Sequence, residues 1–230
     1  MKTIGLIGGM SFESTITYYQ VVNEKIKERL GGFHSAKVLL YSVDFQEIEE
    51  CQSAGDWKKG AEILIHAAKS LETAGADFIL ICTNTMHKVA PQIQAQITIP
   101  IIHIAEATAL ELHKKNMKKV LLLGTKYTMT EDFYKEKIIE SGIDVCIPDD
   151  DKIELINHII FDELCLGIQS EDSRNQLLEI IKEMSDRGAE GVVLGCTEIG
   201  LLIQQDRSEL PVFDTTLIHA EKAVLLALED

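Results

Sequence analysis

Short apolar runs alternate along the chain with longer segments in which apolar residues recur every three or four positions. The runs predict strands at residues 3–8, 37–43, 77–82, 99–103, 118–124, 143–147, 190–195 and 211–213. The periodic segments predict helices at residues 13–29, 45–51, 57–74, 86–95, 105–115, 129–140, 150–166, 171–187 and 216–228. Strands that alternate with helices favour an α/β fold, in which mostly parallel sheets carry helices on both faces.

Residues 74–87 and 187–200 look like two copies of one strand-to-loop unit. They read AGADFILICTNTMH and RGAEGVVLGCTEIG, and they align without a gap. Directly after the apolar run, the alignment pairs Thr83 with Cys196. A duplicated unit that places one reactive side chain in each copy indicates two groups that face a single substrate across a pseudo-dyad.

The repeat extends beyond this unit. Residues 2–8 resemble residues 118–124, and residues 99–103 resemble residues 210–214, in the same order and at a similar separation. The sequence therefore predicts two similar subdomains that arose by duplication.

The chain is expected to pass between the subdomains twice, because its last helix returns to the first half. We expect residues 1–104 and 213–230 to form the first subdomain and residues 105–212 the second.

Composition limits the classes of partner. The chain has 22 basic and 37 acidic residues, a net charge of −15, which disfavours nucleic acid or an anionic membrane as partner. The first apolar run is too short for a signal peptide, and no stretch approaches the ~18 apolar residues of a membrane span, so we expect a cytoplasmic protein. The five cysteines include no C-x-x-C pair and are expected to be free thiols.

Cys196 is the leading candidate for chemistry. It is expected at the carboxyl end of a strand, just before a helix, where ligands bind in open α/β sheets and where a helix N-terminus would lower the thiol pKa. Cys146 and Cys165 lie inside apolar patterns and are interpreted as packing groups. Cys82 precedes Thr83 by one residue, so strand alternation predicts that its side chain points away from the site.

The loop Gly8-Gly9-Met10-Ser11 follows the first predicted strand and opens a helix. Its backbone N–H groups could hold a carboxylate, and the alternative is a tight turn. The loop lacks both the G-x-G-x-x-G pattern and the P-loop lysine, which argues against nucleotide binding.

Four histidines could assist a thiol: His87, His103, His158 and His219. None has metal-ligand spacing to another histidine or cysteine, so no metal is expected. Asp214 and His219 follow the last predicted strand, where they could orient a site group. The alternatives are a helix cap for Asp214 and a surface role for His219.

The motifs GGMSFEST (8–15), CTNTMH (82–87), LGCTEIG (194–200) and PVFDT (211–215) resemble those of the aspartate/glutamate racemase family. The resemblance implies two similar α/β subdomains with the active site between them, no cofactor, an amino-acid substrate and a homodimer. In that family two opposed cysteines act as acid and base at the substrate Cα.

Position by position, Cys196 matches the second cysteine of the family, and the first cysteine falls on Thr83. The resemblance assigns the substrate's carboxylate and ammonium groups to Met10, Ser11, Asn84, Thr85 and Thr197. Glu198, in the same loop, is grouped with these binding residues.

Two basic residues that typically hold an acidic side chain in that family have no match here. Residues 38–57 contain no lysine or arginine, and Ile168 stands where a lysine is often found. These two departures count against an acidic substrate, but the resemblance as a whole still implies a cofactor-independent racemase, with aspartate or glutamate as the expected substrate. The alternatives are a single-cysteine decarboxylase of the arylmalonate type and a catalytically impaired amino-acid-binding protein.

Overall fold

The computed structural model describes residues 1–229, and the chain divides into two compact units. The first contains Met1–Ile104 and the segment from His219 onward, and the second contains Ala105–Ile218. The expected return to the first unit at residue 213 is too early, because Val212–Asp214 forms the last strand of the second sheet. The chain instead returns within the last helix.

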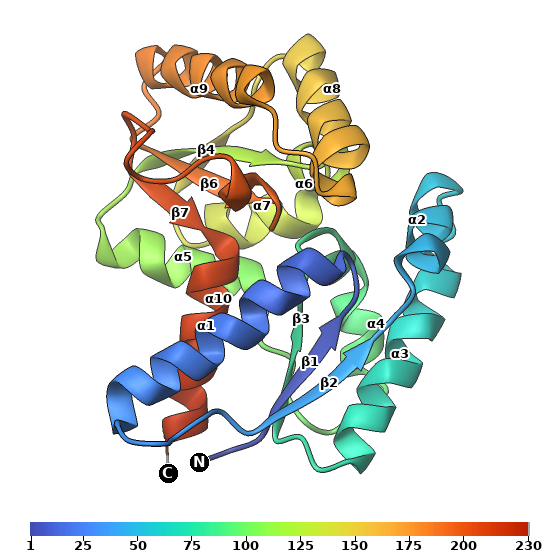
Figure 1. Ribbon diagram of the computed structural model, residues 1–230. Coiled ribbons are helices and arrows are strands. Elements are labelled where there is room, and N and C mark those ends of the chain that lie inside the picture. Colours follow the sequence, from blue (N-terminus) through green and yellow to red (C-terminus); the bar gives the residue numbers. More distant parts are fainter. Residues whose placement is uncertain (230) are drawn as a thin grey trace. The chain divides into compact units, whose positions relative to one another are not determined.

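The first unit is built on a parallel sheet of order β2-β1-β3 (Figure 1). Its strands are β1 (Ile4–Gly8), β2 (Val38–Ser42) and β3 (Phe78–Ile81). Its helices are α1 (Phe12–Leu30), α2 (Phe45–Ser53), α3 (Trp57–Thr73), α4 (Ala90–Gln94) and the end of α10 (Thr215–Leu228).

Strand alternation divides the core of this unit into two layers. On β1, Ile4 and Leu6 pack with α1 and α10, whereas Ile7 packs with α2, α3 and α4 on the other face. The strand is therefore buried on both sides, which explains its continuous apolar sequence.

The second unit is built on a parallel sheet of order β5-β4-β6-β7. Its strands are β4 (Lys119–Gly124), β5 (Asp144–Cys146), β6 (Gly191–Gly195) and β7 (Val212–Asp214). Its helices are α5 (Ile104–Lys114), α6 (Lys126–Thr130), α7 (Asp132–Ile139), α8 (Asp150–His158) and α9 (Glu171–Asp186). The helices α8 and α9 lie on one face of this sheet, and α5 and α7 lie on the other (Figure 1). The predicted α/β fold with two parallel sheets is confirmed.

Four predicted elements differ in detail. Residues 99–103 form only an isolated bridge to β3, since Pro100 has no N–H to extend a ladder. The helix predicted at 129–140 is two helices, α6 and α7, because Glu131 between them is extended. The segment 150–166 continues past α8 as a π-helix, Ile159–Glu163, and a 3₁₀ turn, Leu164–Leu166. The helix predicted at 86–95 begins as a 3₁₀ helix, Thr85–Val89, before α4.

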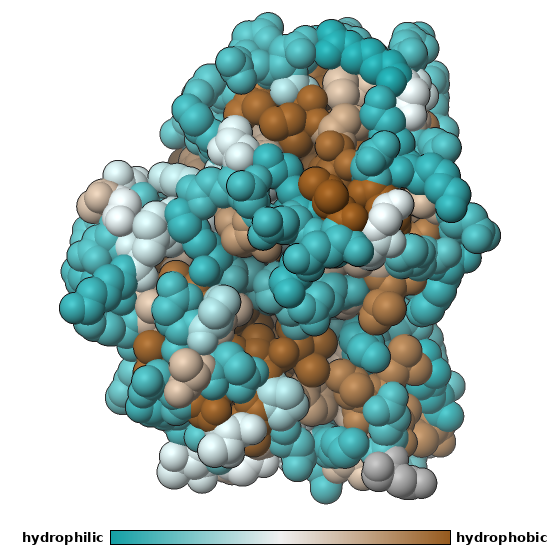
Figure 2. Space-filling view, turned by 180° about the vertical axis from the view of Figure 1, so that it is seen from behind, coloured by the Kyte–Doolittle hydropathy of each residue, from teal (hydrophilic) through white to brown (hydrophobic). Residues whose placement is uncertain are grey.

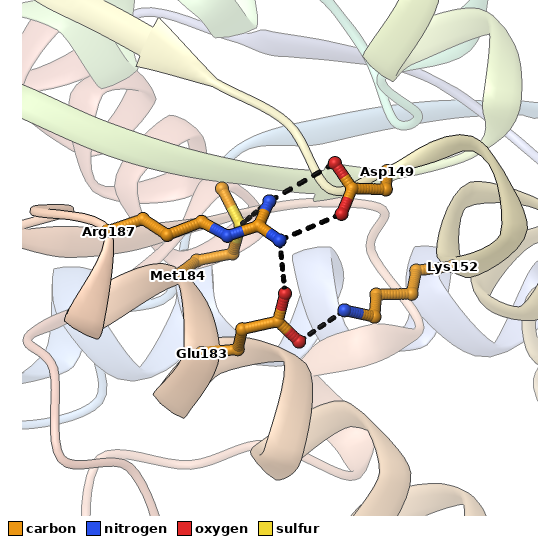
Figure 3. Close-up of polar contacts among 5 residues, drawn as sticks. All are labelled: Asp149, Lys152, Glu183, Met184 and Arg187. Carbon is orange, nitrogen blue, oxygen red and sulfur yellow. Dashed lines mark hydrogen bonds and ion pairs between the residues drawn. The ribbon is translucent and has the colours of Figure 1, made fainter.

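An ion-pair network joins the start of α8 to the end of α9 (Figure 3). The Arg187 guanidinium donates to both carboxylate oxygens of Asp149, at 3.1 and 2.9 Å, and lies 2.6 Å from Glu183. Lys152 pairs with the other oxygen of Glu183. Because these side chains are partly exposed, the network fixes the register of the two helices more than it adds stability.

The face seen in Figure 2 is largely hydrophilic, with apolar residues reaching the surface between polar ones. Elsewhere on the first unit, Phe12, Ile16 and Tyr19 are exposed along one side of α1. Across residues 1–229, no helix combines the length and the apolar character that crossing a membrane requires.

Candidate active site

The end of β3 places Cys82 and Thr83 in different surroundings. The Cys82 N–H donates to the Ile7 carbonyl (2.9 Å), which extends the ladder by one residue. The Cys82 side chain is 0% exposed and packs in the core layer under α1 and α10, where burial strongly raises its pKa. Thr83 is partly exposed just after the strand. As alternation predicts, Cys82 is a core residue.

The 3₁₀ helix after Thr83 turns the chain back over the strand end. Asn84 and Thr85 are buried at its start. One turn later, the His87 imidazole lies with Nδ1 2.8 Å from the Thr83 carbonyl oxygen. The predicted binding residues Asn84 and Thr85 therefore follow Thr83 directly within one compact turn.

The glycines of the loop after β1 are required by close packing. Gly9 has φ +90°, and a Cβ there would lie 2.2 Å from the Val43 carbonyl oxygen. The Gly9 N–H donates to the Thr15 hydroxyl (2.8 Å), which in turn donates to the Ser11 carbonyl (2.8 Å). The Gly9 N–H, which was expected to bind an anion, thus donates to a side chain of α1 instead.

The two predicted binding residues of this loop are buried. The Met10 side chain packs into the core layer shared with α2, α3 and α4, so a substrate contact there would use its backbone. The Ser11 carbonyl accepts hydrogen bonds from the hydroxyls of Ser14 and Thr15. These bonds lie at the first turn of α1, where Ser11 is the N-cap residue.

In the second unit, Cys196 comes directly after β6, the strand that corresponds to β3. Its side chain is 6% exposed. The Cys196 thiol donates to Glu198 Oε2 at 3.1 Å, and the Thr197 hydroxyl donates to the same oxygen at 2.6 Å. One buried carboxylate oxygen therefore accepts hydrogen bonds from both neighbouring side chains.

The expectation that a helix N-terminus lowers the pKa of Cys196 is wrong. Burial raises the pKa of the Cys196 thiol well above its ordinary value, and the Glu198 carboxylate raises it further. Only a short 3₁₀ turn, Ile199–Leu201, follows the cysteine, so no α-helix directs its dipole at the sulfur. Cys196 is held as a protonated thiol.

Asp214 is a helix cap, which was one of its two sequence-based interpretations. Its Oδ1 accepts from the N–H groups of Thr216 (2.8 Å) and Leu217 (3.1 Å) at the start of α10. A Cβ at Gly200 would lie 2.4 Å from Asp214 Oδ2, which explains the glycine that ends the CTEIG motif. The cap thus supports the loop that carries Cys196.

The surface role considered for His219 is wrong, because this residue is completely buried in the first unit. The Tyr18 hydroxyl lies 2.8 Å from His219 Nδ1, and the Ile102 carbonyl lies 2.7 Å from Nε2. Burial, with the neighbouring His87, lowers the pKa of His219 to about 3. Burial, with the neighbouring His103, lowers the pKa of His87 well below its ordinary value.

These two depressed values predict acid sensitivity. The unfolded chain binds protons at both histidines below pH ~6.5, whereas the folded chain does not, so the stabilisation is present above that pH and is lost as the pH falls toward 3. At ~1.4 kcal/mol per pH unit, lowering the pH from 7 to 5 should cost about 2 kcal/mol at His219, and His87 should add to this loss in the same direction. Urea unfolding at both pH values measures the loss.

The matched variants for this experiment are His219→Gln and His158→Asn. His219→Gln removes one of the two buried titrating groups and should reduce the acid-dependent loss by about 2 kcal/mol. His158 is an exposed residue that pairs with Asp162 on the surface, so His158→Asn should leave the slope unchanged. Equal slopes in wild type and His219→Gln would contradict the assignment.

The structure does not supply the missing basic anchor near β2. A cavity of about 510 Å³ at the end of this strand contains one lysine, Lys59, beside three carboxylates, Asp44, Glu47 and Glu62. Its surplus of negative charge disfavours an acidic ligand. Ile168, the other position that lacks a cation, is exposed on the loop before α9.

Sequence reasoning missed three contacts of the candidate residues. It grouped Glu198 with substrate ligands and did not foresee its bond to Cys196. It also missed the contact of His87 with Thr83 and that of Tyr18 with His219. The four-residue spacing of Thr83 and His87 was an available signal, because one helical turn brings such a side chain to the earlier carbonyl. No local signal pairs Tyr18 with His219. Within residues 1–229, no group of three histidine, cysteine or acidic side chains is arranged to hold a metal ion.

Comparison with known proteins gives a consistent result along the whole chain. The pattern of the Asp/Glu/Hydantoin racemase family matches residues 7–223. The broad specificity amino-acid racemase RacX of Bacillus subtilis is 25% identical over 225 residues, which cover 96% of each chain. A candidate Asp/Glu racemase from Yersinia pestis has a crystal structure with a TM-score of 0.92 and 51% identity, covering 100% of both chains. The structure of an aspartate racemase homologue from Pyrococcus horikoshii has a TM-score of 0.86 and 40% identity over 100% of both chains.

Proposed function

Because the chain belongs to the Asp/Glu/Hydantoin racemase family, whose members include amino-acid racemases, we propose that it interconverts the enantiomers of aspartate or glutamate without a cofactor. One observation carries the proposal. In the two units, the equivalent strands β3 and β6 lead into a hydroxyl and a thiol: Thr83 follows β3 after the one-residue extension of its ladder at Cys82, and Cys196 follows β6 directly. We place these two groups on opposite faces of the substrate Cα.

The state of Cys196 sets its starting role in this mechanism. As a buried thiol it is an acid, ready to protonate a carbanion on its face of the substrate. To act as base, it must first pass its proton to Glu198 Oε2, after which the thiolate can remove the Cα proton. The pair carries one negative charge before and after this transfer, so the step adds no buried charge.

Thr83 completes the reaction on the other face. When Cys196 removes the Cα proton, the Thr83 hydroxyl donates a proton to the carbanion and regains one from water. In the opposite direction Thr83 is a poor base. Its hydroxyl is a far weaker acid than a thiol, so the alkoxide that could remove a proton is scarcely populated, and a water must relay the proton. The two directions therefore differ in their difficult step.

This assignment gives Glu198 a different role from the substrate contact expected from the sequence. Its carboxylate is 3% exposed and accepts from Cys196 and Thr197, which stabilises the charged oxygen. A second carboxylate, that of the substrate, would be repelled at this position. We propose that Glu198 stores the proton of Cys196.

Glu198→Gln tests that role. The amide can still accept a hydrogen bond from the thiol but cannot take its proton, so kcat/KM should fall about tenfold at pH 7, equally in both directions. The loss should shrink as the pH rises, because the thiol can then ionise to solvent. Loss of the carboxylate charge should also move alkylation of Cys196 by iodoacetamide, read by mass spectrometry, to lower pH.

Glu179→Gln is the matched control, because it removes one carboxylate from the exposed side of α9 in the same unit. It should leave the alkylation profile and the kinetics of wild type unchanged. A Glu198→Gln enzyme with a raised KM but unchanged kcat and pH profile would instead make Glu198 a substrate ligand.

Solvent deuterium tests the proposed function itself. The protein is incubated with a panel of L- and D-amino acids in D₂O, and NMR follows loss of the Cα–H signal together with the appearance of the other enantiomer. We expect exchange and inversion of aspartate or glutamate. Absence of exchange across the panel, with a melting temperature raised by an amino acid, would indicate a binding protein.

A specific observation favours one alternative activity. Cys196 is protonated, and the cations that typically hold an acidic side chain are missing from residues 38–57 and from position 168. A single thiol acid suits protonation of the carbanion left by decarboxylation of an arylmalonate-type substrate. Release of CO₂ from phenylmalonate, with no Cα exchange on amino acids, would establish that activity.

The same missing cations bear on substrate range. We propose that backbone N–H groups or a cation outside those two positions contact the substrate side chain, so uncharged analogues such as homoserine should show measurable exchange. Strict rejection of every neutral amino acid would show that a cation reads the side chain.

A further inference from the structure

A buried chain of contacts in the first unit begins at the carbonyl of Thr83. His87 Nδ1 lies 2.8 Å from this oxygen, and the Ile104 N–H donates to His87 Nε2 at 3.2 Å. The His87 ring meets the His219 ring edge-on, with centroids 5.7 Å apart. His219 in turn contacts the Ile102 carbonyl and the Tyr18 hydroxyl.

The partners of His87 define its protonation. The Thr83 carbonyl can only accept a hydrogen bond, and the Ile104 N–H can only donate one. His87 must therefore be neutral, with its proton on Nδ1 and a lone pair on Nε2. A second proton on Nε2 would point at the Ile104 N–H.

The partners of His219 define the opposite tautomer. The Ile102 carbonyl can only accept, so the proton of His219 lies on Nε2. Nδ1 is then the acceptor for the Tyr18 hydroxyl. His103 completes the ring cluster, with its centroid 4.6 Å from that of His87.

These contacts lie at the two points where the chain leaves and re-enters the first unit. Ile102 and Ile104 are among the last residues before the chain passes to the second unit at Ala105, and His219 is the first residue after it returns. The same network therefore connects Thr83 to the two segments where the chain leaves and re-enters the first unit, and through Tyr18 it also reaches the helix α1.

We propose that His87 is a positioning residue for Thr83, and that His219 and Tyr18 lock His87 and the chain crossings into one arrangement. The proposal rests on the proposed function in one respect, the role of Thr83 in proton transfer. The Thr83 carbonyl belongs to the peptide that joins Thr83 to Asn84, so His87 sets the orientation of the turn that carries the reacting hydroxyl. A displacement of about 1 Å at such a group can cost 10²-fold in rate.

Two substitutions separate positioning from simple core packing. In His87→Asn the amide nitrogen takes the place of Nδ1 and can still donate to the Thr83 carbonyl. In His87→Gln the longer amide reaches the Ile104 N–H, but it has no donor at the Nδ1 position. Both variants remove the ring, so they share the loss of aromatic packing.

In D₂O, exchange at the Cys196 face without inversion does not require Thr83. We therefore expect His87→Gln to keep this exchange within about twofold of wild type while inversion falls roughly tenfold or more. His87→Asn should retain inversion within about threefold. Parallel loss of exchange and inversion, to the same extent in both variants, would show that His87 only packs the core and would overturn the proposal.

A second measurement does not depend on racemisation. Long-range ¹H–¹⁵N NMR should show His87 protonated on Nδ1 and His219 on Nε2, with neither ring titrating between pH 5.5 and 8 at this burial. Tyr18→Phe should shift the Nδ1 signal of His219. A His87 ring that titrates near pH 6.5 or carries its proton on Nε2 would overturn the network, whereas absence of Cα exchange in wild type with both tautomers as stated would count against the proposed function alone.

Discussion

Cys196→Ser is expected to lower Cα exchange by roughly 10³-fold, to near the background rate. A serine hydroxyl can occupy the place of the thiol and donate to Glu198, but it ionises far less readily, so neither carbanion protonation nor proton removal proceeds at a useful rate. NMR loss of the Cα–H signal in D₂O measures the effect. The side chain is small and partly enclosed by polar groups, so the variant should fold.

Cys82→Ser is the control for this result. Cys82 lies one residue before the position equivalent to Cys196 and is fully buried in an apolar layer. A hydroxyl there costs about 1–3 kcal/mol of stability, so the melting temperature should fall while exchange is largely retained. If a folded Cys82→Ser protein loses as much exchange as Cys196→Ser, then Cys82 and not Thr83 faces the substrate.

The choice between Cys82 and Thr83 shows what could be predicted from the sequence. Strand alternation alone indicates which of two neighbouring side chains points to the core, and burial of Cys82 agrees with that prediction. The two parallel sheets were predictable for a similar reason, because buried parallel strands read as continuous apolar runs between helical segments. Such patterns report burial, which is a property of each segment by itself.

The electrostatic state of Cys196 could not be predicted in the same way. The sequence places a cysteine after a strand, but the pKa of its thiol depends on enclosure by the unit's core and on the direction of Glu198. The prediction that a helix dipole lowers this pKa was wrong, because the segment after Cys196 forms a single 3₁₀ turn instead of an α-helix. Partner choice between buried polar groups is a tertiary property, and the pairing of Tyr18 with His219 across the sequence is a second example.

The end of the first unit shows a related limit. The sequence predicts that residues 213–230 belong to the first unit, because the last helix is expected to return to the first half. In the structure β7 pairs with β6 through Asp214, and the return falls inside α10. A helix that serves two units carries one continuous apolar pattern, so its periodicity does not show where one unit ends.

Thr83→Val is expected to reduce inversion by roughly 10²-fold while Cα exchange of one enantiomer persists. Valine keeps the branched shape of threonine but has no proton to donate, so proton transfer fails on one face only. Exchange on the Cys196 face continues, because that thiol and Glu198 can return a solvent deuteron to the face from which the proton was taken. The ratio of exchange to inversion, measured from the same NMR and chiral analysis, should therefore rise steeply.

Thr83→Cys should have the opposite effect, since it creates a pair of thiols at equivalent positions of the repeat. Enantiomers have equal free energy in water, so kcat/KM must be equal in the two directions in every variant. The asymmetry between Thr83 and Cys196 can therefore appear only in kcat and KM separately, or in the ratio of solvent-isotope exchange to inversion. We expect wild type to differ in kcat for the L and D substrates, and in Thr83→Cys the two kcat values should converge and rise about tenfold, a barrier change of about 1.4 kcal/mol.

The two Thr83 variants together separate the mechanisms. If Thr83→Cys is well folded but no faster, and Thr83→Val loses exchange and inversion in parallel, then Thr83 does not deliver a proton to a second face. A mechanism with a single acid at Cys196 would remain, and that is the arrangement of the decarboxylase alternative. If Thr83→Val keeps exchange and loses inversion while Thr83→Cys gains rate, the hydroxyl is the weaker member of a two-face pair, and the buried Cys196–Glu198 pair is the stronger one.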